Sequence, residues 1–421
     1  MIPLKLIRED PTRITRAAAD KGEMIEMERL LVLDEQSRAL IGEAEQKKGE
    51  RNRISEEIAQ LKREGSDADR LIAEMRDLSS VIKNDDAKLA ELREEIDSLL
   101  MWIPNIPHES VPMGKDESAN EVTRSWGEEP TFDFDPKNHT DLAESLGLID
   151  FARGAKISGS GFPLFTGAGA RLERALINFM IEHQGNRGYR EVMTPFMTLP
   201  SAMEATGQIP KLEEDMYCVE KDGLYLIPTA EVPVTNIHRE EILNESDLPI
   251  FYTAYSPCFR REAGSYGKET RGLLRIHQFN KVEMVKFVRP ENSYDELESL
   301  TADAESVLQA LGLHYRVVSL STGDLSFAAA KCYDLEVWAP GEKRWLEVSS
   351  CSNFESFQAR RAGIRFRGEG GKVRHVHTLN GSGVATPRLM TALLETYQTD
   401  EGTVTLPKPL HSYFGSSLLK P

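Results

Sequence analysis

The segment FRREAGSYGKETRGLLRIHQFNKVE, residues 259–283, is the most informative stretch of this 421-residue chain. It connects two β-like runs, 251–262 and 274–287, through a polar loop at 263–272 that contains glycine. Runs of this kind on either side of a short polar loop are typical of a β-hairpin. We therefore predict a long antiparallel hairpin over these residues.

The second strand of this hairpin has two different faces, because side chains alternate along a strand. The polar face carries Arg275, His277, Phe279, Lys281 and Glu283, and the apolar face carries Leu274, Ile276, Val282 and Met284. Phe279 and Glu283 are expected to lie about 13 Å apart, enough to stack a purine at one and hold an ammonium group at the other. Arg260 and Glu262 share a face of the first strand. The alternative is an exposed face of paired surface charges.

The chain from 137 to 421 alternates helical patterns with short β-rich runs. Examples of such runs are LYLIPT at 224–229, FYTAYSPCF at 251–259 and RWLEVSS at 344–350. This alternation predicts an α+β domain built on an antiparallel sheet. Three prolines in MWIPNIPHESVP, residues 101–112, end the preceding helix, and residues 104–136 are expected to form a linker.

Residues 1–103 are expected to form a helical arm. Between Leu33 and Leu99 the chain has no proline, and Gly65 marks a helix end with Ser66 or Asp67 as the next N-cap. We predict two antiparallel helices with a coiled-coil seam, which Asp85 interrupts. The seam residues are Leu33, Leu40, Ile54, Ile58 and Leu61 in the first helix, and Leu71, Met75, Leu78, Ile82, Leu89, Leu92, Ile96 and Leu99 in the second.

The whole chain has a net charge of −17, and this negative charge disfavours indiscriminate nucleic-acid binding. One segment of the arm is nevertheless basic. The basic residues between 47 and 63 are Lys47, Lys48, Arg51, Arg53, Lys62 and Arg63. An RNA backbone could dock on this segment. The alternative is a solvated helix face with i,i+4 ion pairs, which is the more common case.

The composition indicates a soluble cytoplasmic protein. No window approaches the length of a membrane helix, and the N-terminus lacks the apolar core of a signal peptide. Cys218, Cys258, Cys332 and Cys351 form no CxxC pair, so buried free thiols are expected.

The 259–283 segment resembles the second signature motif of class II aminoacyl-tRNA synthetases. LNGSGVATPRLMTALLE, residues 379–395, is similar to the third motif, and the helix around 171–183 followed by YREVMTPFM resembles the first. Three further features resemble the seryl-tRNA synthetase family: the helical arm, the TAE triplet Thr229–Glu231, and EVSS at 347–350. The resemblance spans nearly the whole chain.

The resemblance implies an ATP site. Arg260 would bridge the substrate carboxylate and the α-phosphate, Glu262 would hold the adenine amino group, and Phe279 would stack on adenine. Arg275 and Arg388 would grip the phosphates. The residues implied for ATP binding and catalysis are Arg260, Arg261, Glu262, Arg275, Ile276, Phe279, Glu347, Val348, Ser349, Ser350 and Arg388.

The resemblance also implies a magnesium site and a serine pocket. Glu347 and Ser350 match the Mg²⁺ ligands, and a bulge or strand end must bring them to one side. The residues implied for serine are Thr229, Ala230, Glu231, Arg260, Glu283, Asn380 and Ser382. Without the resemblance, the TAE triplet is equally well explained as a helix N-cap.

The implied activity is the ATP-dependent joining of L-serine to tRNA(Ser), and to tRNA(Sec) where the host has one, by a homodimer without membrane attachment. A catalytic domain that loads another acceptor, or a non-catalytic scaffold, are the rival interpretations. GSYGKET at 264–270 does not fit a P-loop, because Lys268 precedes Glu269 rather than Ser or Thr. His375 and His377 lack a cluster of further ligands, which favours a structural role.

Overall fold

The computed structural model describes residues 1–263 and 272–421. The chain divides into two compact units, one of residues 2–19 and 23–104, the other of residue 1, residues 20–22 and residues 105–421. The GSYGKET segment lies outside the described residues. Among the residues that are described, no helix has the length and apolar character needed to cross a bilayer.

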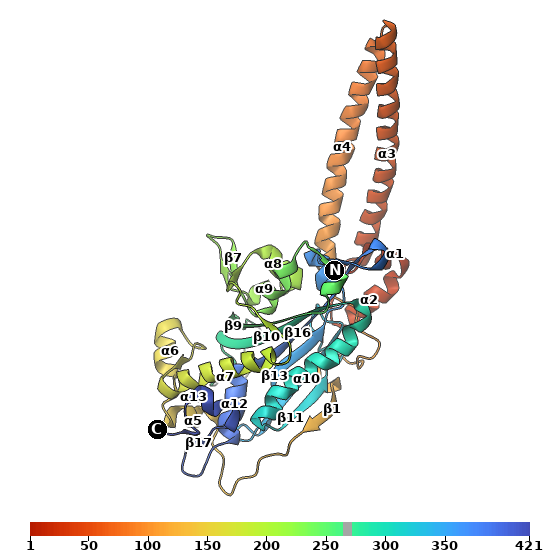
Figure 1. The fold of residues 1–421 in the computed structure, drawn as a ribbon. Helices are drawn as coiled ribbons and strands as arrows, with labels where there is room; N and C mark the ends of the chain where they lie inside the picture. Colours follow the sequence, from red (N-terminus) through yellow and green to blue (C-terminus); the bar gives the residue numbers. More distant parts are fainter. Residues whose placement is uncertain (264–271) are drawn as a thin grey trace. The chain divides into compact units, whose positions relative to one another are not determined.

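The smaller unit is helical, with α1 (Leu4–Glu9), α2 (Pro11–Asp20), α3 (Met27–Glu64) and α4 (Asp69–Leu100). The two long helices form the predicted antiparallel pair (Figure 1). Gly65 ends α3 in the left-handed conformation at φ +71°, with its N–H directed at the carbonyls of Leu61 and Lys62. The N-cap prediction was wrong by one residue, because Ala68 occupies that position while the Asp67 side chain accepts from the N–H of Asp69.

The predicted seam residues of both long helices are buried or half-buried. Near the turn between the helices, Ile54, Ile58 and Ala68 form a small core. Asp85 is buried at its position in the seam, where its carboxylate lies 2.7 Å from the ammonium group of Lys47. The interruption noted in the sequence is therefore an ion pair between the two helices.

The larger unit is built on an eight-stranded sheet, as predicted for an antiparallel α+β domain. All its pairings are antiparallel except that of β4 with β9. In spatial order the strands are β1 (Glu121–Trp126), β11 (Tyr315–Ser319), β12 (Lys331–Ala339), β13 (Arg344–Asn353), β16 (His377–Ala385), β10 (Gln278–Val288), β9 (Ile250–Phe259) and β4 (Arg190–Glu191). Segment 104–136, expected as a linker, thus contributes the edge strand β1.

Helices α7 (Gly167–Gly185), α10 (Ser293–Leu311) and α12 (Thr386–Thr396) pack against this sheet (Figure 1). Their apolar faces, which include Leu300 of α10, share one large core with inward residues of the sheet, among them Met284 and Leu335. Covering one face in this way leaves the other available for a cavity. Of the four free cysteines, Cys218 is exposed and Cys258, Cys332 and Cys351 are buried.

Shorter elements complete the larger unit. The helices are α5 (His139–Ser145), α6 (Phe151–Ser158), α8 (Pro200–Thr206), α9 (Glu231–Thr235), α11 (Phe357–Ala362) and α13 (His411–Phe414). The small sheets pair β2 (Ile149–Asp150) with β3 (Leu164–Phe165), β17 (Val404–Thr405) with β18 (Leu418–Leu419), β7 (Leu224–Leu226) with β5 (Met197–Thr198) and β6 (Cys218–Val219), and β14 (Arg365–Arg367) with β15 (Val373–His375) and β8 (Ile242–Asn244).

The hairpin of β9 and β10 is shorter than the sequence predicted. Its strands end at Phe259 and begin at Gln278, so Arg260–Glu262 and Leu274–His277 lie outside the ladder. One further hydrogen bond joins the N–H of Arg260 to the carbonyl of His277. The N–H of His277, however, donates to the carbonyl of Gly161 outside the hairpin. Glu262 has a φ of +52°, which no strand accommodates. The strict alternation expected for Arg275 and His277 therefore does not apply.

Candidate active site

A cavity of about 710 Å³ lies in the larger unit, lined by residues of β10, β12, β13, β16, α12 and the segments that flank the β9–β10 hairpin. Its size suits a nucleotide together with a small amino acid. The structure brings together most of the residues predicted from the sequence. The predicted residues that line the cavity are Thr229, Glu231, Arg260, Glu262, Arg275, Ile276, Phe279, Glu347, Val348, Ser350, Asn380, Ser382 and Arg388.

Four predicted residues do not line the cavity. Arg261 is exposed, and its backbone N–H donates to the carbonyl of Asp215. Ala230 is buried as the N-cap of α9, and the Ser349 hydroxyl donates to the carbonyl of Ser382. Glu283 is also buried, but it reaches cavity-lining residues through its side-chain bonds.

One end of the cavity holds opposed charges around an aromatic ring. The Arg260 guanidinium lies 5.1 Å from the centroid of the Phe279 ring, which fits a cation–π contact. An Arg275 nitrogen lies 3.0 Å from a Glu262 oxygen, and an Arg388 nitrogen lies 3.0 Å from a Glu347 oxygen. Three guanidinium groups therefore line one cavity, two of them within reach of carboxylates.

A β-bulge aligns Glu347 with Ser350, as the sequence required. The register of β12 against β13 shifts between Leu335, which pairs with Ser349, and Glu336, which pairs with Glu347, so Val348 is the extra residue. The Ser350 hydroxyl then donates to the Glu347 carboxylate at 3.3 Å. Two residues that regular alternation would separate thus share one side of the strand.

Asp334 on β12 joins this group, which sequence reasoning missed. It pairs directly with Ser350 and lines the cavity. Burial and the nearby Glu347 carboxylate raise the pKa of Asp334 well above its ordinary value. Partial desolvation in the cavity acts to raise the pKa of Glu347, whose side chain is 44% exposed, but the guanidinium groups of Arg388 and Arg260 outweigh it and lower that pKa. The signal for Asp334 was its register opposite Ser350, which one sequence does not give.

The other end of the cavity is built around Glu283. Its carboxylate accepts from the Thr229 hydroxyl at 3.0 Å and the Asn380 amide at 2.9 Å, and lies 2.6 Å from the Lys281 ammonium group. The Lys281 and Glu283 side chains are 8% and 0% exposed. The polar face of β10 is therefore buried, which excludes the alternative of an exposed face of surface charges.

Glu231 is a second buried carboxyl at this end. It accepts from the Gln358 amide at 2.7 Å, and Gln358 in turn accepts from the Thr378 hydroxyl. Burial and the neighbouring Glu283 raise the pKa of Glu231 to about 7. Lys281 and Gln358, which sequence reasoning did not include, therefore form part of the surroundings of the two carboxyls.

Thr229 makes a local contact as well as a contact within the site, although Ala230 is the N-cap of α9. Its hydroxyl oxygen accepts from the N–H of Glu231, the first residue of α9, as a residue before a helix does. The same hydroxyl donates to Glu283. A local turn and a contact within the site thus use one side chain.

Comparisons with known proteins identify the family. Residues 217–397 match the tRNA synthetase class II core domain (G, H, P, S and T), and residues 1–107 match the seryl-tRNA synthetase N-terminal domain. The chain is 54% identical to the serine–tRNA ligase of Thermodesulfovibrio yellowstonii and 53% identical to that of Bacillus subtilis, over the full length of each. The chain belongs to the seryl-tRNA synthetase family. As a member of this family it is an aminoacyl-tRNA synthetase, an ATP-dependent ligase.

The seryl-tRNA synthetase fold is equally clear from solved structures. A crystal structure of seryl-tRNA synthetase from Pyrococcus horikoshii complexed with ATP superposes with a TM-score of 0.94 at 40% identity, covering both chains completely. The family and fold predicted from the three motifs and the arm are thereby confirmed.

The seryl-tRNA synthetase arm places its predicted RNA-binding residues in two different environments. The ammonium groups of Lys47 and Lys48 lie 2.7 Å and 2.8 Å from carboxylates of Asp85 and Asp86 on the facing helix. Arg53, Lys62 and Arg63 are exposed, and Arg51 is half-buried. The first two lysines therefore contribute to helix pairing as well as to the positive charge.

His375 ends β15 and His377 begins β16. The Nδ1 of His377 lies 2.9 Å from the Ser293 hydroxyl. Burial, with nearby arginines, lowers the pKa of both imidazoles to about 4. Both rings are therefore neutral at physiological pH, and their structural role stays a prediction.

Proposed function

We propose that the cavity binds ATP at its Phe279 end and serine at its Glu283 end, and that Arg260 acts between them. In this assignment adenine stacks on Phe279 with its amino group at Glu262, and Arg275 and Arg388 hold the phosphates. Both arginines are paired with carboxylates, at 3.0 Å in each case. When ATP binds, the two guanidinium groups exchange these carboxylates for phosphate oxygens. The convergence of Arg260, Arg275 and Arg388 on one cavity is the observation that carries this proposal.

Serine recognition rests on two carboxyl groups and one lysine. Glu231 and Glu283 attract the serine ammonium group, and Lys281 neutralises part of their combined charge. Thr229, Asn380 and Ser382 present polar groups at the same end of the cavity. A site of this kind rejects alanine, because the missing hydroxyl leaves buried polar groups unpaired.

The reaction follows from these positions. A serine carboxylate oxygen attacks the α-phosphorus of ATP, the bond to the β-phosphate bridging oxygen breaks, and pyrophosphate leaves. Arg260 stabilises the negative charge that develops between the two substrates. The terminal ribose hydroxyl of the tRNA then attacks the seryl carbonyl carbon, and AMP leaves. No covalent intermediate with the enzyme is needed.

Glu347 and Ser350 fit a magnesium ion, because a carboxylate and a hydroxyl are hard oxygen donors. The Asp334 carboxyl on the facing strand adds a third oxygen ligand to this set. When bound, the ion would neutralise charge on the phosphates. Loss of the proton from Asp334 would accompany binding, since burial and the nearby Glu347 carboxylate raise its pKa.

The basic segment at 47–63 is proposed to hold the backbone of tRNA(Ser), and of tRNA(Sec) where the host has one. Arg53, Lys62 and Arg63 support this role by their exposure, and double-stranded RNA is bound mainly through phosphates and shape. A homodimer in the cytoplasm is part of the same proposal. Exposed Met193 and Met197, in the segment that resembles the first motif, give it an apolar surface.

Amino-acid-dependent exchange of pyrophosphate into ATP tests the proposal. Serine should support exchange, while alanine, threonine and glycine should not. Exchange with threonine or glycine but not with serine would refute the serine assignment. Replacing Arg388 with Ala should raise the KM for ATP, and an unchanged KM would refute the placement of the phosphates.

A further inference from the structure

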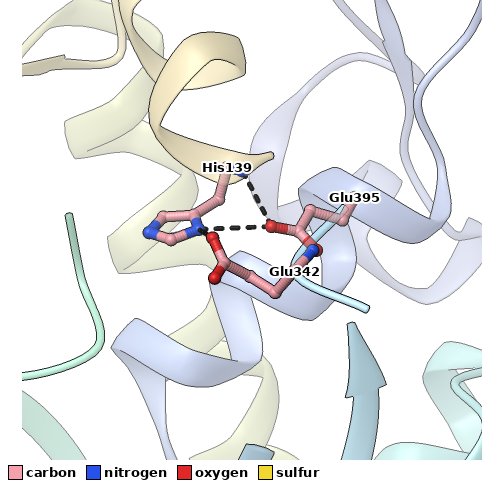
Figure 2. A group of neighbouring side chains, drawn as sticks. All are labelled: His139, Glu342 and Glu395. Atoms are coloured by element: carbon pink, nitrogen blue, oxygen red, sulfur yellow. Dashed lines mark hydrogen bonds and ion pairs between the residues drawn. The ribbon is translucent and has the colours of Figure 1, made fainter. Parts of the chain in front are cut away.

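Buried His139 lies against Glu342 and Glu395 (Figure 2), and none of the three is among the residues that line the cavity. His139 begins α5, Glu395 lies in α12, and Glu342 lies in the turn between β12 and β13. The Nδ1 of His139 is 3.2 Å from a carboxylate oxygen of each glutamate. His139 and Glu395 are 1% and 0% exposed, so this group is part of the interior.

The Glu395 carboxylate is fully engaged. One oxygen accepts from the backbone N–H and the ring Nδ1 of His139, and the other accepts from the N–H groups of Gly341 and Glu342. Four N–H donors therefore occupy both oxygens of this buried side chain. Glu395 thereby joins α12 to α5 and to the β12–β13 turn.

The other ring nitrogen faces the ATP site. The N–H of Leu273 donates to Nε2 of His139 at 3.2 Å. Since Nε2 accepts, Nδ1 carries the proton that is donated to Glu395. Gly272 packs against the same ring, and a Cβ at this position would lie 2.2 Å from Nε2. The chain at Gly272 and Leu273 is therefore seated directly on the imidazole.

The segment that His139 holds is a wall of the cavity. Leu273, Leu274, Arg275 and Ile276 all line it, and the Leu274 carbonyl accepts from Nε of Arg388 at 3.4 Å. Arg388 lies on α12, the helix that also carries Glu395. Two consecutive residues of this wall are thus fixed by one helix, Leu274 directly and Leu273 through His139.

A metal ion is the competing explanation, because the three side chains could each offer one ligand atom. Metal binding at Nδ1 would move the proton to Nε2, where it would oppose the N–H of Leu273. The Glu395 oxygens also already accept four N–H groups. The arrangement favours hydrogen bonding over a metal.

We propose that His139 is a positioning residue for ATP, which fixes the Leu273–Ile276 wall relative to Arg388 through the bond from Leu273 N–H to Nε2. The inference rests on the proposed ATP site. His139 does not touch the substrates in this scheme. It determines where Arg275 and the Ile276 backbone lie.

Two substitutions separate this bond from the rest of the group. His139→Asn can retain a donor to Glu395 but cannot reach Leu273, whereas His139→Gln can place an amide oxygen near the position of Nε2. We expect His139→Asn to raise the KM for ATP in pyrophosphate exchange by about tenfold, as for a buried donor left unpaired. His139→Gln should stay within about threefold of the parent chain. The KM for serine should change little in both.

Gly272→Ala is an independent second variant, since its Cβ would displace the chain from the imidazole. It should also raise the KM for ATP. An unchanged KM for ATP in His139→Asn, or equal impairment in His139→Gln, would overturn the inference. About one equivalent of tightly bound metal in the purified chain, lost in His139→Gln, would also overturn it. An unchanged KM for ATP in Arg388→Ala would mean that the ATP site itself is misplaced. If Arg388→Ala raises the KM for ATP but His139→Asn leaves it unchanged, only the positioning role of His139 fails.

Discussion

The pKa of about 7 at Glu231 leads to a specific pH dependence of serine use. Glu231 must be ionised to attract the serine ammonium group, and the ionised fraction is about one-tenth at pH 6 and about nine-tenths at pH 8. We therefore expect kcat/KM for serine to fall about tenfold from pH 8 to pH 6. Glu231→Gln should remove this dependence and lower kcat/KM at pH 8 by about tenfold or more, through loss of a charge-assisted hydrogen bond.

The assay is serine-dependent pyrophosphate exchange at saturating ATP and magnesium, at constant ionic strength between pH 6 and pH 8.5. Glu173→Gln is a matched control, because burial also raises the pKa of Glu173 but its carboxylate bonds to Asn280 and Thr386 outside the cavity. It should keep the parent pH profile. A flat profile in the parent chain, or the same profile in Glu231→Gln, would refute the reasoning.

The same carboxyl links pH to stability. Its pKa in the folded chain lies above its ordinary value of 4.5, so the folded state binds this proton more tightly than the unfolded state. Below about pH 4.5 the protonated Glu231 carboxyl contributes fully to the free energy of unfolding. That contribution, roughly 3 kcal/mol, is lost as the pH rises from about 4.5 through about 7. Glu231→Gln should remove that loss, and serine should stabilise the parent chain more at pH 8 than at pH 6 in thermal unfolding.

Three further predictions concern the pocket and the arm. Glu283→Gln removes the carboxylate that lies 2.6 Å from the buried Lys281, so the KM for serine should rise about 100-fold while the KM for ATP stays constant; parallel increases in both would contradict the assignment. Reversing the charge of Arg51 and Arg53 to Glu should weaken tRNA charging but spare pyrophosphate exchange, and equal loss of both would indicate misfolding instead. Ile54→Ala should destabilise the arm by about 2–5 kcal/mol in chemical unfolding followed by helical circular dichroism, and a change below about 1 kcal/mol would argue against its place in the seam.

The local patterns of the chain predicted its elements well. Apolar spacing identified the two long helices because tertiary packing there repeats every few residues, and Gly65 marked their turn. The hairpin was placed correctly, but its length was overestimated. The alternation of polar and apolar residues does not predict that Glu262 has a positive φ or that the N–H of His277 donates to the carbonyl of Gly161. Both features depend on the chain around the cavity.

The sequence by itself determined the family and the antiparallel sheet, and it singled out thirteen residues that the structure places around one cavity, because each motif is a short run whose chemistry is visible in order. Only the tertiary structure decided which charges meet. It opposed Asp334 to Ser350 on a neighbouring strand and placed Lys281 against Glu283 in the interior. It also seated Leu273 on His139, 134 positions away in the chain. These contacts join residues far apart in sequence or depend on burial, and burial and distance are what set a pKa or complete a hydrogen bond.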